Sequence, residues 1–383
     1  MASLPANVVE LTQALVRIPS VNPDGDPGTD GIGEQQCALF VADFLRSSGA
    51  KVTLEEVEPA RPNVIGRFPT HPSANGSTKP RILFAPHTDT VSVGGMTIEP
   101  FGGELRDGKI WGRGASDTKG PMASMLWALH EMRHEIPSLP VEVHFVGFMS
   151  EESAQLGSQH FAKHHGRYDL AIIGEPTSLK TVFRHKGCLW ADVHTTGVAV
   201  HGATPQLGVN AIVKMAKLVS ALDTEFREIL AEAGGEDEWL GASSINLGMI
   251  QGGTRSNIVA DSCKLRVDIR TTPGLQRVGG ALSLLKDFVH RIDKSAQVTV
   301  ASEAFHLDTD PTNPLVQKLL AAGSELTGAP WFCDAAFLSV AGTPAIAIGP
   351  GSIAQAHTKD EFIAVSDLEA GVAFFLRFLA GLK

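Results

Sequence analysis

The 383-residue sequence lacks the features that mark several common protein classes. Its only cysteines are far apart in the chain, with no CxxC pair and no dense framework, so we expect reduced, mostly buried thiols: Cys37, Cys188, Cys263 and Cys333. No apolar run approaches about 18 residues, and residues 1–20 have no cationic segment followed by an apolar one. These absences predict a soluble cytoplasmic protein.

Positive charge is also scarce. The chain has 32 basic and 42 acidic residues, a net charge of −10, and no local cluster of lysine or arginine. The resulting field repels phosphate backbones and anionic lipid, so we expect neither a nucleic acid nor a membrane as partner. Hydrophobic residues make up 43% of the chain, which suffices for a core, and the length suggests two domains.

Four short apolar runs suit strands that are buried on both faces of a mostly parallel sheet. The runs occupy residues 82–85, 141–148, 170–173 and 344–348. Apolar residues recur at helical spacing in residues 8–18 and 35–45. With 39 glycines and 22 prolines in the chain, this pattern predicts an α/β fold rather than a helical bundle.

From about residue 184 the pattern changes to strand, helix, strand, strand, helix, strand. We predict the strands at residues 188–196, 243–250, 262–270 and 297–303, and the helices at 209–222 and 275–292. This order is the ferredoxin-like split βαβ arrangement, in which helices cover one face of an antiparallel sheet. We therefore predict one α/β domain, formed by residues 1–182 and 306–383, which is interrupted by a smaller α+β insert of residues 183–305.

Each of the four apolar runs is followed by acids or a histidine. In chain order these are His87 and Asp89, Glu151 and Glu152, Glu175, and the loop that holds His357. The carboxyl ends of parallel strands share one edge of a sheet, so these loops can converge, and Asp117 in the glycine-containing segment 112–120 is a fifth candidate. Two imidazoles and several carboxylates form the ligand set of a divalent metal site, and a further carboxylate can be the base.

Each of these residues also has an ordinary interpretation. A single His-x-Asp is often a hydrogen-bonded turn, a Glu-Glu pair is often a solvated edge, and Asp117 could cap the helix that follows it. One histidine among fourteen is weak evidence. An acid or a histidine after all four runs is harder to explain by solubility alone, and this coincidence favours a two-metal hydrolase.

Five segments resemble the motifs of the co-catalytic zinc deacylase and exopeptidase family. They are residues 85–91 (APHTDTV), 112–120, 150–153 (SEES), 173–177 (IGEPT) and 356–361 (AHTKDE). The family includes acetylornithine deacetylase, succinyl-diaminopimelate desuccinylase, aminoacylase and bacterial glutamate-releasing carboxypeptidases. The resemblance runs from about Val8 to the C-terminus, and the chain looks most similar to the acetylornithine deacetylase branch.

The resemblance implies two zinc ions, with cobalt or manganese as possible substitutes. It also implies which residues bind them. His87 and Glu175 would bind one metal, Glu152 and His357 the other, and Asp117 would bridge both. Asp89 would accept the second N–H of the His87 imidazole and so fix its tautomer. Glu151 would act as general base for a hydroxide that bridges the metals. Thr118 follows Asp117 in a peptide bond that the family usually has in the cis form.

Three residues of the insert match further family positions. His201 would stabilise the oxyanion from the partner subunit, which makes the insert a lid and a dimerisation domain, although a surface residue at a strand end is the alternative. Arg270 and Asn257 match positions that bind the substrate carboxylate, for which a guanidinium offers two parallel hydrogen bonds.

These residues together predict a metal-dependent amidohydrolase that removes the acyl group from an N-acyl amino acid, for example N-acetylornithine or a similar N-acetyl amino acid. Succinyl-diaminopimelate desuccinylase, a dipeptidase or carboxypeptidase, and a specialised amidase are alternatives within the family. A catalytically inert relative that binds a metabolite is the alternative from another class. The expected partners are a small N-acyl amino acid or dipeptide and a second copy of the chain.

Overall fold

The computed structural model describes residues 4–24, 33–73 and 76–383. The chain divides into two compact units, which are described separately below. Unit 1 comprises Met1–Phe183, Thr309–Thr327 and Cys333–Lys383, and unit 2 comprises Arg184–Asp308 and Gly328–Phe332. Among the described helices, none combines the length and the apolar character that a membrane crossing needs.

Four parallel strands form the centre of the unit 1 sheet. In spatial order they are β6 (Glu142–Gly147), β3 (Arg81–Ala85), β7 (Leu170–Ile173) and β15 (Ala345–Ala347). Every residue of β7 and β15 is buried, as expected for apolar strands that are covered on both faces. The α/β fold predicted from the apolar runs is thus confirmed, with these runs as its parallel core.

Antiparallel strands flank this core on both sides. β1 (Lys51–Glu58) and β2 (Arg61–Arg67) extend the sheet beyond β6, and β8 (Thr181–His185) extends it beyond β15. The apolar runs did not predict β1, because half of its residues are charged, as is common on an edge strand. β13 (Leu307–Asp308) and β14 (Leu326–Ala329) both pair with β8. A small separate sheet is formed by β16 (Phe362–Ala364), β5 (Lys109–Trp111) and β4 (Glu104–Arg106).

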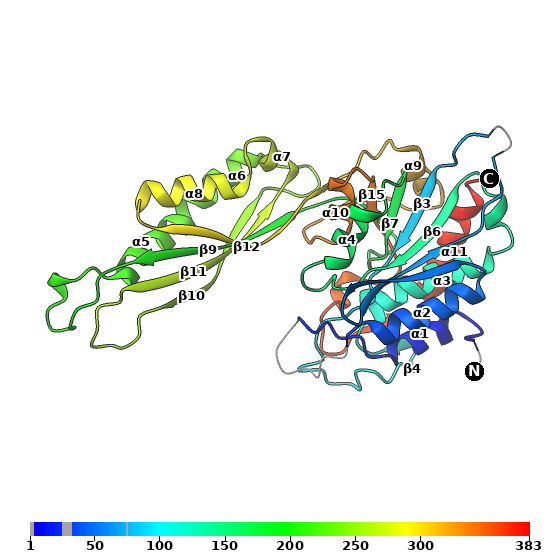
Figure 1. The fold of residues 1–383 in the computed structure, drawn as a ribbon, viewed down its shortest axis with the longest axis horizontal. Helices are drawn as coiled ribbons and strands as arrows, with labels where there is room; N and C mark the ends of the chain where they lie inside the picture. The colour runs from blue at the N-terminus through cyan, green and yellow to red at the C-terminus, as the bar shows by residue number, and fades with distance from the viewer. Residues whose placement is uncertain (1–3, 25–32, 74–75) are drawn as a thin grey trace. The chain divides into compact units, whose positions relative to one another are not determined.

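Helices cover the sheet of unit 1 (Figure 1). α1 (Val8–Val16), α2 (Gln35–Ser47), α3 (Gly120–Glu131) and α11 (Val365–Ala380) pack together and share one core with the apolar side chains of the sheet. The shorter helices are α4 (Leu156–His164), α9 (Pro314–Ala321) and α10 (Ala335–Val340). α10 contacts α4, β7 and β15, so it lies beside the strands whose loops carry the candidate site.

Unit 2 is a four-stranded antiparallel sheet with helices on one face (Figure 1). The strand order is β10-β11-β9-β12, which is the order of the split βαβ arrangement predicted for the insert. Its elements are β9 (Gly187–Thr196), α5 (Ala211–Ala221), α6 (Arg227–Gly234), β10 (Ser244–Gly252), β11 (Ser262–Thr271), α7 (Pro273–Arg277), α8 (Gly280–Ile292) and β12 (Gln297–Ala304).

The second predicted helix of the insert, residues 275–292, is broken in the structure. α7 ends at Arg277, and Gly279 and Gly280 have φ values of 105° and 79° before α8 continues. Glycine adopts such positive φ values without a steric penalty, so the backbone can break at this point. The apolar residues on both sides keep helical spacing, which is why the sequence predicted one continuous helix.

Candidate metal centre

The four loops predicted to converge follow four neighbouring parallel strands. β6, β3, β7 and β15 are adjacent in the sheet, so their carboxyl ends lie side by side. Donor atoms of His87, Asp117 and Glu152 all lie within 4.8 Å of one another, and this is the one group of possible metal ligands found among the described residues.

Asp117 lies between the two imidazoles of the candidate site. Its Oδ1 is 3.1 Å from Nε2 of His87, and its Oδ2 is 3.5 Å from Nε2 of His357. The same His357 nitrogen is 3.1 Å from Oε2 of Glu152. Each oxygen of Asp117 therefore faces a different histidine, as expected of a carboxylate between two cations. The Asp117–Thr118 peptide bond is cis, and the N-cap of α3 is Lys119, so Asp117 does not cap that helix.

Glu175 supplies a test of whether the site fits a metal. Its side chain is buried, and Oε1 has no hydrogen-bond partner among the described residues. A buried carboxylate oxygen without a partner is costly, and a cation at this position would satisfy it. Asp117 and His87 are the charged groups that act most strongly on Glu175. The donor set of two imidazoles and three carboxylates therefore fits divalent metal ions.

Burial and crowding of the carboxyl groups determine their protonation. Burial, together with the nearby charge of Asp117, raises the pKa of Glu152 to about 7. Burial also holds the pKa values of Glu151 and Glu175 well above their usual range. For His87, burial alone would lower the pKa, but hydrogen bonds to Asp117 and Asp89 raise it well above the usual value. Raised pKa values at these positions mean that protons compete with a metal ion for the same ligand atoms.

Asp89 organises the residues around it rather than facing the cluster. Nδ1 of His87 is 3.0 Å from the backbone carbonyl oxygen of Asp89 and 3.4 Å from its carboxylate. The carboxylate accepts hydrogen bonds from the backbone N–H groups of Glu151 and Glu152, at 3.1 and 3.0 Å. Asp89 therefore orients His87 partly through its main chain, and it also holds the loop after β6.

Glu151 has a different environment from Glu152. Its Oε1 accepts a hydrogen bond from Nε2 of Gln155 at 3.2 Å, whereas Glu152 faces His357. The charges that act on Glu151 include those of His87 and Glu175. A carboxyl group with a raised pKa beside a candidate metal cluster is suited to accept a proton near neutral pH.

Two functional candidates were not identified from the sequence. Glu361 is fully buried, and its carboxylate accepts hydrogen bonds from the backbone N–H groups of Gly114, Ser116 and Asp117 and from Nη1 of Arg113. It therefore fixes the segment that presents Asp117. In the sequence it is the last residue of the 356–361 motif, to which no role had been assigned.

Asp334 is the second functional candidate that was not identified from the sequence. Oδ1 accepts a hydrogen bond from the hydroxyl of Ser158 at 2.5 Å, and Oδ2 is buried without a partner among the described residues. Burial raises the pKa of Asp334 to about 7. Nothing in the sequence marked this residue, because it stands directly before α10 rather than after an apolar strand.

The three predicted residues of the insert lie within unit 2. His201 pairs with Ile258 as an isolated bridge, and the Gly202 N–H donates to the carbonyl oxygen of Asn257 at 2.8 Å, so His201 and Asn257 are on adjacent loops. Arg270 lies at the other end of β11, where Nη2 pairs with Asp268 at 2.9 Å. The structure thus brings His201 and Asn257 together and separates Arg270 from both.

This fold and cluster are those expected of a metallohydrolase, and comparison with known proteins agrees. The family model for peptidase family M20/M25/M40 matches residues 83–381. The chain belongs to this family and is a hydrolase, which confirms the resemblance drawn from the sequence motifs.

Individual relatives cover nearly the whole chain. Acetylornithine deacetylase from Proteus mirabilis is 31% identical over 376 residues, 94% of this chain and 93% of the relative. Aminopeptidase PepT from Bacillus cereus has a similar structure, with a TM-score of 0.76 at 19% identity and 99% of both chains covered. YXEP from Bacillus subtilis, a dinuclear metal-binding peptidase of the M20 family, has a TM-score of 0.71 at 13% identity, covering 97% of this chain and 96% of its own.

Proposed function

We propose that this hydrolase is a homodimeric, cytoplasmic di-zinc enzyme that removes the acyl group from an N-acyl amino acid, with N-acetylornithine or a similar N-acetyl amino acid as substrate. The observation that carries the proposal is the position of Asp117 between His87 and His357, with further carboxylates around it. The similarity to an acetylornithine deacetylase supports the choice of substrate class.

In this proposal His87 and Glu175 would hold one zinc ion, and Glu152 and His357 would hold the other. Asp117 would serve as a ligand to both. Cobalt or manganese would accept the same donors. Bound ions would lower the pKa of water and polarise the substrate carbonyl group.

Glu151 moves the proton. Its carboxylate takes a proton from the attacking water and delivers it to the nitrogen of the leaving amine, as a general base and then a general acid. Its position directly before Glu152 in the chain keeps it beside the cluster, while its contact with Gln155 gives it an orientation of its own.

His201 is suited to donate a hydrogen bond to the oxyanion. The Ala203 backbone N–H donates to Nδ1 of His201 at 3.1 Å, so Nδ1 is an acceptor and the neutral ring carries its proton on Nε2. An exposed Nε2–H is a donor that can stabilise negative charge as it develops on the carbonyl oxygen. Asn257 on the adjacent loop and Arg270 would bind the substrate, with the guanidinium on its carboxylate.

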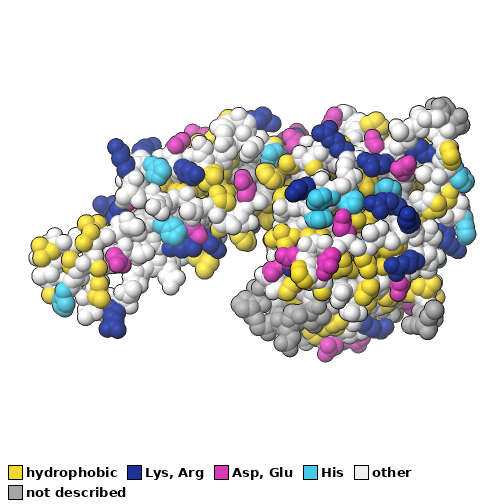
Figure 2. Space-filling view, in the orientation of Figure 1, with side chains coloured by type: hydrophobic (Ala, Val, Ile, Leu, Met, Phe, Trp, Pro, Cys, Tyr) yellow, Lys and Arg dark blue, Asp and Glu magenta, His cyan; other side chains and the backbone are white. Residues whose placement is uncertain are grey.

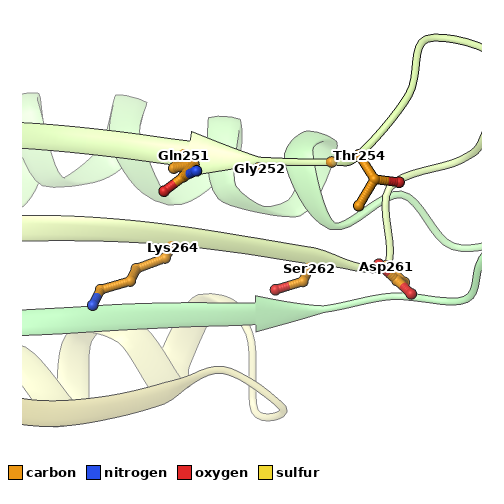
Figure 3. Close-up of a pocket in the computed structure, with 7 residues that line it drawn as sticks. Gln251, Gly252, Thr254, Asp261, Ser262 and Lys264 are labelled. Carbon is orange, nitrogen blue, oxygen red and sulfur yellow. The ribbon is translucent and has the colours of Figure 1, made fainter.

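The surface of unit 2 supports a dimer. β10 is an edge strand, and large hydrophobic side chains are exposed on it, including Met249 at 69% and Ile250 at 59%. Figure 2 shows hydrophobic side chains gathered on the surface of unit 2. A polar hollow of about 240 Å³ lies between the ends of β10 and β11, beside Thr254 and Asp261 (Figure 3). An unpaired edge with exposed apolar residues is a typical protein interface.

The separation of Arg270 from His201 and Asn257 supports completion of each site by the partner subunit. The eight steps along β11 from Ser262 to Arg270 span about 26 Å at the usual rise of a strand. A small N-acyl amino acid cannot contact both ends of β11 in one copy of unit 2. If Arg270 binds the substrate in its own subunit, His201 and Asn257 must serve the site of the other subunit.

The test is an amine-release assay of the zinc- or cobalt-loaded protein. Substrates are N-acetylornithine, other N-acetyl amino acids, N-succinyl-diaminopimelate and several dipeptides. We expect preference for one N-acetyl amino acid and loss of activity on chelation. Preference for the succinyl substrate or a dipeptide would replace the proposed substrate by an alternative within the family. No cleavage of any substrate by protein with two bound metals would overturn the deacylase proposal and leave a specialised amidase or an inert relative.

Metal affinity is expected to increase with pH through neutrality. Glu152, with a pKa of about 7, and His87, with a raised pKa, bind protons below that pH in the metal-free protein. Ligation requires them deprotonated, so metal binding releases protons, and lower pH weakens it. Calorimetric zinc titrations in buffers of different ionisation enthalpy measure this release. An affinity that stays constant between about pH 6 and pH 8 would contradict the proposed ligands.

A further inference from the structure

The loop that carries Glu151 and Glu152 is held by three consecutive backbone N–H groups. The N–H of Ser150 donates to Oε1 of Glu34 at 3.2 Å, and those of Glu151 and Glu152 donate to the two oxygens of Asp89. Ser150 has a φ of 65°, in the left-handed region that a residue with a side chain adopts only where its surroundings hold it. Asp89 therefore fixes only the second and third residues of the loop, and Glu34 fixes the first, Ser150.

Glu34 is itself fixed by a buried ion pair. Its side chain is fully buried, and Oε2 and Oε1 accept hydrogen bonds from Nε and Nη2 of Arg61, at 2.9 and 2.8 Å. These two parallel hydrogen bonds fix the orientation of the carboxylate relative to the guanidinium. Nη1 of Arg61 also pairs with Asp24 and Glu58, at 2.6 and 2.7 Å.

The same guanidinium is connected to Asp89. Nη2 of Arg61 is 3.4 Å from Oδ1 of Asn22, and Nδ2 of Asn22 donates to Oδ2 of Asp89 at 2.8 Å. Both carboxylates that hold the loop are thus joined through Arg61, directly for Glu34 and through Asn22 for Asp89. If the Glu34–Arg61 ion pair only connected α2 to β2, Glu34 would need no contact with Ser150.

We propose that Glu34, held by Arg61, is a positioning residue that sets the start of the Ser150–Glu152 loop. It places Glu152 toward the metal and Glu151 toward the water that it deprotonates. This inference rests on the proposed function for the roles of Glu151 and Glu152, whereas the effect of Glu34 on the loop itself does not depend on them.

The experiment compares Glu34→Ala with Glu58→Gln. Both variants remove a carboxylate partner of Arg61, but Glu58 is partly exposed and does not contact the loop, so it is the matched control. We expect Glu34→Ala to accelerate amide hydrogen exchange of Ser150 at least about 10-fold, because its N–H loses a buried acceptor. It should also weaken zinc affinity and lower kcat by about 10- to 100-fold, the usual effect of losing a group that orients a ligand. Glu58→Gln should stay within about 2-fold of the wild type in all three.

A merely structural role for Glu34 predicts another result. In that case Glu34→Ala would lower the melting temperature, while loop exchange, zinc affinity and kcat of the folded protein stayed within about 2-fold of the control; this outcome overturns the proposal. If Glu34→Ala does not fold, Glu34→Asp takes its place, since the shorter side chain can still pair with Arg61 but draws its carboxylate back from Ser150. Unchanged exchange and zinc affinity in Glu34→Asp would overturn the proposal as well.

The readouts separate this inference from the proposed function. Hydrogen exchange and zinc affinity are measured without a substrate. If no member of the substrate panel is cleaved by the wild type, the proposed function fails, but a faster exchange of Ser150 and weaker zinc binding in Glu34→Ala would still support the positioning role.

Discussion

Glu151→Ala is expected to lower kcat at least about 100-fold while the protein keeps its metal, because general acid–base catalysis typically contributes that much or more. The attacking water would lose its proton acceptor, and the leaving amine its proton donor. KM should change less than kcat, since the proton transfers occur in the transition state. The measurements are steady-state kinetics on the preferred substrate and metal content by atomic absorption.

Glu152→Ala is the matched comparison for this prediction. The two glutamates are adjacent in the chain and both are held through their backbone N–H groups by Asp89, so loop disruption should affect them equally. Glu152 faces His357, however, and its loss should remove one metal. If Glu151→Ala loses metal as well, Glu151 is a ligand and its assignment as the base is wrong.

The sequence predicted the core of the fold because buried parallel strands leave a strong signal. β7 and β15 are short, wholly apolar and buried throughout. β1 left no such signal, since an edge strand carries charged residues that resemble a surface loop. α6 was missed for another reason: α5 leads into a π-helical turn at Leu222–Phe226, and the apolar spacing alone did not reveal that another helix follows.

The candidate site was predictable where its residues follow the parallel strands. His87, Glu152 and Glu175 lie in the loops that follow β3, β6 and β7, and adjacency of the strands brings these loops together. Asp117 follows no strand of the sheet, and its role came from resemblance. Glu34 was not identified, because its function depends on a contact with a backbone N–H group 116 residues away in the chain. Long-range hydrogen bonds to the main chain have no periodicity that a sequence can display.

His201→Ala is the second variant with a large expected effect. If Nε2 of His201 meets the oxyanion, its loss should lower kcat by about 100-fold or more and raise KM much less. Its local fold should persist, because the contacts of this loop with Ile258 and Asn257 are made by the backbone. Asn257→Ala is the matched neighbour on the adjacent loop. If His201→Ala loses kcat to this extent while its dimerisation is unchanged, the effect is on catalysis and not on assembly.

Mixing His201→Ala with Glu151→Ala is expected to restore activity that neither variant has alone. In a hybrid dimer with sites completed in trans, one site carries both defects, and the other combines an intact Glu151 with the intact His201 of the partner. Random exchange of equal amounts makes half of the dimers hybrids, so activity should return to about one quarter of the wild type. The measurement follows kcat after unfolding and refolding the mixture, with each variant refolded alone as control. His201 lies near one end of β11 and Arg270 at the other. A mixture that stays as inactive as its components would therefore show that His201 acts within its own subunit, and would require Arg270 to have another role.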